Sequence, residues 1–296
     1  MANGIQQHAI APAVVLRGDG AWSDAQDMIA GICKRPLLLG RSQATRTLRH
    51  TLSAELAQRG AQVTLAELNH DCCEPDLQRL ARELHANSCD AVVAIGGGKV
   101  LDAGKLLAHR HGLPCITVPT SAATCAGWTA LANLYSPEGA FEGDVALERC
   151  PDLLVFDHQL VRQAPGVTLA SGIADAMAKW YEASVSSGAS GDGLVQQAVQ
   201  MARVLRDQLL LEARQAMAQP DSEAWVRVAE ACGLTAGLIG GIGGARCRTV
   251  AAHAVHNGLT QLRASHGRLH GEKVGFGILV QLRLEEMIGG NRLAGQ

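Results

Sequence analysis

Aromatic side chains are scarce in this sequence, although apolar residues are not. Four Trp, two Tyr and three Phe make up 3% of 296 residues, whereas 47% of the residues are hydrophobic. Small aliphatic side chains must therefore fill the interior, which indicates a helix-rich, alanine-packed protein long enough for one large core or two modest domains. The net charge of −2 gives nucleic acid no basic surface to bind, so we expect none as a partner.

Long apolar runs are also lacking. Residues 1–20 contain no basic start followed by an uninterrupted apolar core, and no later run approaches the length of a membrane span. We therefore expect a cytoplasmic protein that does not associate with membranes.

The nine cysteines include no Cys-x-x-Cys pair. An odd number without such spacing, in a chain with no export signal, indicates reduced thiols. Most are expected to be core residues. Only Cys125 lies within a motif, and there a small buried hydrophobe and a site residue are both acceptable interpretations.

The first half of the chain alternates short β-branched runs with helical patterns, which is typical of βαβ units around a parallel sheet. The expected strands are 35–39, 62–65, 91–95, 114–118 and 153–156, and the expected helices are 21–32, 43–58, 75–86 and 100–111. We predict an α/β nucleotide-binding domain over residues 1–164.

After Asp157 the β pattern disappears, and residues 168–186, 194–218, 222–238, 250–262 and 271–288 look helical. Pro165 and Gly166 indicate a domain boundary, so we predict an all-α domain over residues 165–296. The glycine-rich stretch 237–244 is either a loop or a place where helix backbones approach closely. The loop is favoured, because each glycine costs about 1 kcal/mol in a helix interior.

The segment from Asp90 to Lys99 runs from an apolar strand through Gly96, Gly97 and Gly98 into a helix. Glycines let backbone N–H groups approach a pyrophosphate, and a helix N-terminus favours negative charge. A tight turn is the simpler interpretation of three glycines alone. The GxGxxG fingerprint is absent here.

A carboxylate, Asp175, interrupts the alanine-rich helical stretch 171–183. Burying it without a partner would be costly, so a cation or donors should lie opposite it. His253, His256 and His270 are the best candidates downstream. Two imidazoles and one carboxylate with an open position suit catalytic Zn²⁺ and also Fe²⁺.

Together these motifs resemble the iron-containing alcohol dehydrogenase family, in its glycerol dehydrogenase-like branch. The resemblance rests on the helix start at Gly172–Asp175, His253-Ala-Val-His-Asn-Gly258 and His270-Gly-Glu-Lys273. Residues 119–128 and 178–183 are most similar to the bacterial hydroxycarboxylate dehydrogenase A group. The resemblance implies a dehydroquinate synthase-like fold. Relatives continue through several more helices beyond the position of Gln296, so we expect a C-terminally short member.

The resemblance also implies the dinucleotide contacts. The family loop Gly-Gly-Gly-x-x-x-Asp matches Gly96 to Asp102, which assigns Gly97, Gly98 and Lys99 to the phosphates. The nicotinamide side would be lined by Thr120, Thr124, Thr129, Leu131 and Tyr135. Ordinary packing is the alternative for Thr129 and Leu131.

Arg41 stands where glycerol dehydrogenases carry an aspartate. An acid there accepts hydrogen bonds from ribose hydroxyls, whereas arginine pairs with a 2′-phosphate, so we predict NADP(H) over NAD(H). A solvated loop arginine is the alternative.

The resemblance assigns the metal to Asp175, His253 and His270, with His256 beside the substrate. Iron-dependent relatives place a histidine one turn after the aspartate, where this chain has Lys179. A protonated amine is a poor ligand, so three protein ligands are expected, and these favour zinc without excluding iron.

The substrate prediction rests on Cys125, Lys179 and Arg248. Cys125 replaces an aspartate of glycerol dehydrogenases. The side chains of Lys179 and Arg248 are cations, and either one could bind a substrate carboxylate. We therefore predict hydride transfer between nicotinamide and a 2-oxo acid/2-hydroxy acid pair. In the alternative, both cations pair with protein acids such as Glu182.

Three other functions remain open: a glycerol or other polyol dehydrogenase, a sugar-phosphate member of the superfamily, and a truncated, non-catalytic nucleotide-binding member. A homo-oligomer is expected, since a short C-terminus would expose apolar surface.

Overall fold

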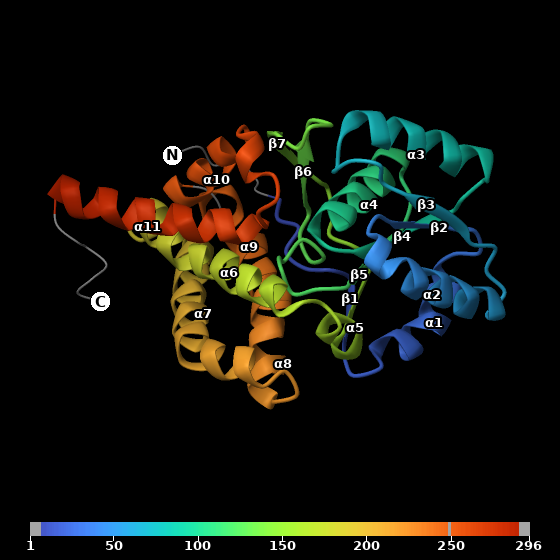
Figure 1. Cartoon of the computed structure of the whole chain (residues 1–296), viewed down its shortest axis with the longest axis horizontal. Coiled ribbons are helices and arrows are strands. Elements are labelled where there is room, and N and C mark those ends of the chain that lie inside the picture. Colours follow the sequence, from blue (N-terminus) through green and yellow to red (C-terminus); the bar gives the residue numbers. More distant parts are fainter. Residues whose placement is uncertain (1–6, 248–249, 290–296) are drawn as a thin grey trace.

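The computed structural model describes residues 7–247 and 250–289. A parallel sheet with its helices forms one end of the molecule, and a group of helices forms the other (Figure 1). The six strands lie in the order β1-β8-β5-β4-β2-β3, and every pair is parallel. The predicted class, an α/β nucleotide-binding half followed by a helical half, is confirmed.

The sheet half follows the predicted alternation closely. Its elements are β1 (Val14–Gly18), α1 (Ala21–Ile32), β2 (Pro36–Gly40), α2 (Arg46–Gln58), β3 (Thr64–Glu67), α3 (Glu74–Ala86), β4 (Ala91–Gly96), α4 (Gly98–His111), β5 (Cys115–Pro119), β8 (Leu153–Asp157) and α5 (His158–Arg162). Neighbouring strand residues point to opposite faces. Leu38 packs with α1 and α2, whereas Leu37 and Leu39 pack with α3 and α4. Both faces are covered, as parallel sheets require.

Besides the short helix α5, two features of this half were not predicted. The edge strand β1 is half exposed, so its apolar signal is weak. A separate antiparallel hairpin, β6 (Leu131–Tyr135) and β7 (Phe141–Ala146), lies between β5 and β8 in sequence. Tyr135 at the end of β6 packs edge-to-face on Phe141 at the start of β7, with ring centroids 5.9 Å apart.

The helical half contains α6 (Gly166–Ser187), α7 (Gly193–Ala218), α8 (Glu223–Glu230), α9 (Ala236–Gly243), α10 (Ala251–Thr260) and α11 (His270–Gly289). The predicted boundary after residue 164 falls between α5 and α6 and stays a prediction. Where α6 passes the loop after β5, a Cβ on Gly172 would lie 1.9 Å from the carbonyl oxygen of Ala122. Only glycine fits there, and it brings Asp175 close to the carboxyl end of the sheet.

The loop prediction for residues 237–244 is wrong, because Ala236–Gly243 is helical. Close packing provides the reason: a Cβ on Gly237 would lie 2.5 Å from Trp128, and one on Gly241 would lie 2.3 Å from the carbonyl oxygen of Ile10. Just before it, a π turn over Ala231–Thr235 lets Gly233 pack against Phe156. Burial at these contacts outweighs the helix propensity cost of glycine.

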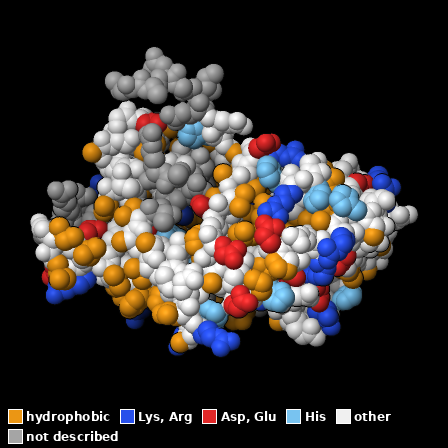
Figure 2. All heavy atoms as spheres, turned by 90° about the horizontal axis from the view of Figure 1, so that it is seen from above, with side chains coloured by type: hydrophobic (Ala, Val, Ile, Leu, Met, Phe, Trp, Pro, Cys, Tyr) orange, Lys and Arg blue, Asp and Glu red, His pale blue; other side chains and the backbone are white. Residues whose placement is uncertain are grey.

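The continuous helical run Glu223–Gly243 is long and apolar enough to cross a membrane by length and composition alone, contrary to the sequence prediction. In the 18-residue apolar window of this run, 56% of the residues are buried inside the protein, as in the core helix of a soluble protein. Exposed apolar side chains instead follow α11, which extends to one end of the molecule (Figures 1 and 2). They include Phe276, Leu279, Met287 and Ile288.

Candidate active site

A cavity of about 960 Å³ lies where the carboxyl ends of β2, β4 and β5 meet α6, α10 and α11. From β2 the chain continues to β3 on one side, and from β4 it continues to β5 on the other side, so the strand order reverses between β2 and β4. The cavity adjoins this point, which is the usual ligand position in open α/β sheets. All the predicted site residues within the described ranges line it: Arg41, Gly97, Gly98, Lys99, Asp102, Thr120, Thr124, Cys125, Thr129, Leu131, Tyr135, Asp175, Lys179, His253, His256 and His270. Arg248 lies outside the described residues.

The glycine loop presents free backbone to this cavity. Gly97 caps α4 without a side-chain hydrogen bond, so the first N–H groups of the helix are available to a ligand. A Cβ on Gly98 would come within 3.0 Å of the Thr124 hydroxyl. The loop can therefore receive an anionic group close to its backbone, as a pyrophosphate site requires.

Asp102, although it lines the cavity, is engaged inside the protein. Burial raises the pKa of its carboxyl group, and Lys105 lies 3.1 Å away as its counter-ion. The Lys105 ammonium also donates to the Thr129 carbonyl at 2.9 Å and to the Leu131 carbonyl. Lys105, which sequence reasoning missed, thus ties the cavity-lining segment before and within β6 to α4.

Arg41 is held by an acid. Its guanidinium forms an ion pair with one oxygen of Asp71, and the ammonium of Lys99 pairs with the other. Lys99 also lies over the Tyr135 ring, 5.5 Å from its centroid. Together these two cations and one carboxylate carry a net charge of +1. Neither Asp71 nor its role was predicted.

Asp175, His253 and His270 converge deeper in the cavity, from α6, α10 and α11. Asp175 Oδ1 lies 3.5 Å from His253 Nε2 and 3.2 Å from His270 Nε2. One candidate ligand atom from each residue lies within 4.8 Å of the others. Bonds of about 2.0–2.3 Å in a tetrahedral zinc site separate ligand atoms by roughly 3.3–3.8 Å. The three donors therefore fit one divalent ion.

Glu182, one turn beyond Lys179 on α6, orients His253. Its Oε2 lies 2.5 Å from His253 Nδ1, and its Oε1 accepts the backbone N–H groups of His253 and Val250 at 2.9 and 2.8 Å. A carboxylate on Nδ1 leaves Nε2 for a metal. The side chain is almost fully buried. Sequence reasoning considered Glu182 only as a partner for cations.

Electrostatics around the trio reflect this pairing. Burial opposes charge on His253, but the carboxylates of Asp175 and Glu182 outweigh it and raise its pKa to about 9. Burial likewise opposes charge on Asp175, and His270 and His253 nevertheless hold its pKa well below the usual value. Without a metal, a proton on His253 thus balances part of the charge of the buried acids. A divalent cation would take over that role.

His256 differs from the other two histidines. Burial, reinforced by the nearby His270, lowers its pKa to about 3, so its imidazole is neutral. Its Nδ1 lies 2.9 Å from Asn257 Oδ1, and its ring centroid lies 4.2 Å from that of His270. It lines the cavity beside the trio.

Lys179 and Cys125 complete the wall near Asp175. Both are buried, and Cys125 also belongs to the core cluster shared by the two halves. Burial raises the pKa of the Cys125 thiol, and the positive charge of Lys179 opposes this. A neutral thiol and a buried ammonium thus lie on the same side of the cavity.

Comparison with known proteins identifies the family of this chain. The sequence profile described as iron-containing alcohol dehydrogenase matches residues 12–158. A glycerol dehydrogenase of Pseudomonas putida is 36% identical over 93% of this chain and 76% of the relative, and an uncharacterized oxidoreductase of Synechocystis is 54% identical over 97% and 74%. The chain belongs to the iron-containing alcohol dehydrogenase family.

Solved structures agree with this assignment. A probable glycerol dehydrogenase from Sinorhizobium meliloti superposes with a TM-score of 0.82 at 28% identity, covering 96% of this chain and 84% of the other. Hydroxycarboxylate dehydrogenase A of Escherichia coli is 39% identical in sequence over 72% of this chain and 60% of its own length.

As a glycerol dehydrogenase-like member of the iron-containing alcohol dehydrogenase family, the protein is an oxidoreductase acting on alcohol groups. A divalent metal and a nicotinamide dinucleotide are the cofactors that fit such a member.

Proposed function

We propose that this protein interconverts a small 2-oxo acid and its 2-hydroxy acid, using NADP(H) in preference to NAD(H) and a zinc ion held by Asp175, His253 and His270. The observation that carries the proposal is the buried Lys179 in the wall of the same cavity as the three donors. A bound metal would supply Lewis-acid polarisation of the substrate carbonyl.

The chain's own residues would bind and orient the reactants. Backbone N–H groups after Gly97 receive the pyrophosphate, and the segment tied down by Lys105 borders the nicotinamide. Lys179 attracts the substrate carboxylate as a point charge. The neutral Cys125 provides no acceptor for a polyol hydroxyl comparable to a carboxylate. Together these features favour a carboxylated substrate over glycerol.

The NADP(H) preference rests on Arg41 and its surroundings. Arg41 and Lys99 share Asp71, and the net positive charge of the three groups favours an added phosphate. Asp71 competes with that phosphate for Arg41, so we expect a preference and not an absolute requirement. Fe²⁺ in place of Zn²⁺ remains compatible with the donor set.

Polyol oxidation is the second candidate. It is favoured by relatives named glycerol dehydrogenase, from Pseudomonas putida at 36% identity and from Escherichia coli at 33%. Arg248 stays a proposed carboxylate ligand on the sequence alone. A homo-oligomer in the cytoplasm likewise stays a prediction, and sedimentation velocity at two protein concentrations would test the oligomeric state.

The deciding experiment measures NADPH oxidation with 2-oxobutyrate, 2-oxoglutarate and dihydroxyacetone. The protein is stripped with a chelator and reloaded separately with Zn²⁺ or Fe²⁺. We expect metal-restored turnover of an oxo acid. Turnover of dihydroxyacetone alone would assign the protein to the polyol dehydrogenases, and tight NADPH binding without any turnover would indicate a non-catalytic member.

A further inference from the structure

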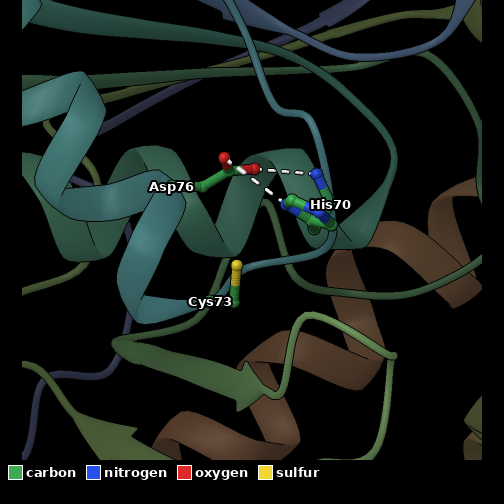
Figure 3. A group of neighbouring side chains, drawn as sticks. All are labelled: His70, Cys73 and Asp76. Carbon is green, nitrogen blue, oxygen red and sulfur yellow. Dashed lines mark hydrogen bonds and ion pairs between the residues drawn. The ribbon is translucent and has the colours of Figure 1, made fainter.

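A second group of metal-binding side chains lies in the loop between β3 and α3 and in the first turn of α3. His70, Cys73 and Asp76 point toward one another there (Figure 3). One candidate ligand atom from each lies within 4.8 Å of the other two. The group shares no residue with the Asp175 trio and does not line the large cavity. It therefore requires its own explanation.

Asp76 is held in position for a ligand. Its Oδ2 accepts the backbone N–H groups of Asn69 and His70 at 2.7 and 2.8 Å, so the carboxylate is fixed by the loop that it closes. Its Oδ1 lies 3.7 Å from His70 Nδ1. That separation falls within the roughly 3.3–3.8 Å expected between two ligand atoms of a tetrahedral zinc site.

The remaining adjustment is small, and one of the three side chains is exposed. Cys73 and Asp76 are buried, whereas the His70 side chain is 45% exposed. Bringing all three donors from a separation of up to 4.8 Å into ligand distance requires about 1 Å of movement. Rotation of the exposed imidazole shortens the distances that involve His70, and rotation of the Cys73 side chain shortens its distance to Asp76. The exposed side of His70 also provides an entry path and room for a water as fourth ligand.

The chemistry of the donors selects the ion. One sulfur, one imidazole nitrogen and one carboxylate oxygen suit zinc, whereas Mg²⁺ and Ca²⁺ prefer oxygen alone. Burial raises the pKa of the Cys73 thiol, and the carboxylates of Asp76, Asp71 and Glu142 raise it further, although the backbone hydrogen bond from Asp76 opposes this. The same carboxylates attract a divalent cation. On coordination, the thiol proton would leave to solvent.

Arg79 is the competing cation, with Nη2 3.3 Å from Asp76 Oδ1. It has other partners, because it also donates to the carbonyl of Glu67 and to Glu83 Oε1, the latter at 2.6 Å. A metal could therefore take Oδ1 while Arg79 keeps these two bonds.

We propose that His70, Cys73 and Asp76 form a second site for a zinc-like divalent ion. The ion would stabilise the loop between β3 and α3, which also carries Asp71, the partner of Arg41 and Lys99. The Cys72 carbonyl in the same loop accepts the backbone N–H of Tyr135 at 2.8 Å. The second site would thus fix one wall of the cofactor cavity without taking part in hydride transfer.

Cobalt substitution tests the proposal without relying on activity. The metal-free full-length protein is titrated with Co²⁺ and followed by equilibrium binding and by absorption. A cobalt–thiolate bond produces an intense near-ultraviolet charge-transfer band, which the Asp175 trio, having no sulfur ligand, does not. We expect two Co²⁺ per chain and one such band.

Single substitutions assign the band. Cys73→Ser and His70→Ala should each weaken the band-forming site more than about tenfold, since even outer partners of a metal contribute that much. Asp175→Asn should remove the Co²⁺ bound at the Asp175 trio and keep the charge-transfer band. The buried control Cys89→Ser should change neither the number of bound Co²⁺ ions nor the band. His70 is exposed, so its loss does not threaten folding.

Three results would overturn the proposal. One is a single Co²⁺ per chain with no charge-transfer band. Another is a band lost in Cys125→Ser, which would place the thiolate beside the Asp175 trio. The third is a band unaffected by His70→Ala.

Discussion

Glu182 and His253 form a bidentate contact in which one carboxylate oxygen lies 2.5 Å from the imidazole Nδ1 and the other accepts the backbone N–H of the same histidine at 2.9 Å. Ring and backbone of His253 are thereby fixed by one buried acid. Such a contact determines which nitrogen is presented to a metal.

Glu182→Gln should lower zinc affinity about 10–100-fold, because the amide keeps the shape but loses the charge that orients the imidazole. The measurement is a competition titration of the metal-free protein with a chromophoric chelator. Excess zinc should restore kcat, which distinguishes positioning from a role in the chemical step. Glu212→Gln, at an acid paired with Arg227, is the matched control. Unchanged zinc affinity in Glu182→Gln would contradict the assignment.

Substitutions at the two partners of the Arg41–Asp71 ion pair should change the preference for NADPH over NADH in opposite directions. Arg41→Ala should lower kcat/KM for NADPH relative to NADH about tenfold, since a hydrogen bond to a charged group is worth about 1.5–3 kcal/mol and this site is partly exposed. Asp71→Asn should raise the same ratio roughly two- to fivefold by releasing Arg41.

Arg46→Ala provides the control for both cofactor variants, because Arg46 pairs with Glu67 and does not line the cavity. Steady-state kinetics with both cofactors give the ratio directly. If Arg41→Ala leaves it unchanged, Arg41 does not bind a 2′-phosphate.

Lys179→Met should reduce kcat/KM for a 2-oxo acid by about 10–150-fold, the equivalent of one charged hydrogen bond. Dihydroxyacetone, which lacks a carboxylate, serves as the internal control and should be affected much less. Zinc content must be measured in parallel, because Lys179 lies one turn from Asp175. Lys273→Met, outside the cavity, is the control variant. Equal losses with both substrates would mean that Lys179 does not recognise the carboxylate.

The cysteines should be nearly inert in the folded protein. All nine are buried, and burial raises the pKa of Cys33 and of Cys115 to about 12. At pH 8 a thiol with that pKa is about one part in ten thousand thiolate, and the thiolate is the reactive form. A chromogenic disulfide reagent at pH 8 should therefore react with all nine thiols per chain only when a denaturant is present. Rapid reaction of several thiols without denaturant would contradict the burial.

Local patterns in the sequence were sufficient for the fold class. Strand and helix periods repeat within single elements, so β2, β4 and α1 were predicted within one or two residues. The half-exposed β1 and the hairpin were missed, because a weakly apolar edge strand and a short antiparallel pair lack a strong local period. The glycine-rich α9 was mistaken for a loop, since its stability comes from contacts with Trp128 and Ile10, far away in the chain.

The candidate site divides in the same way. Short motifs around Gly97, Asp175, His253 and His270 are readable because each keeps its chemistry within a few consecutive residues. The pairing of Glu182 with His253, of Asp71 with Arg41, and of Lys105 with the β6 backbone joins segments 26 to 71 residues apart. No local pattern specifies such pairs. They follow from packing and from the cost of burying charge, which only the tertiary structure determines.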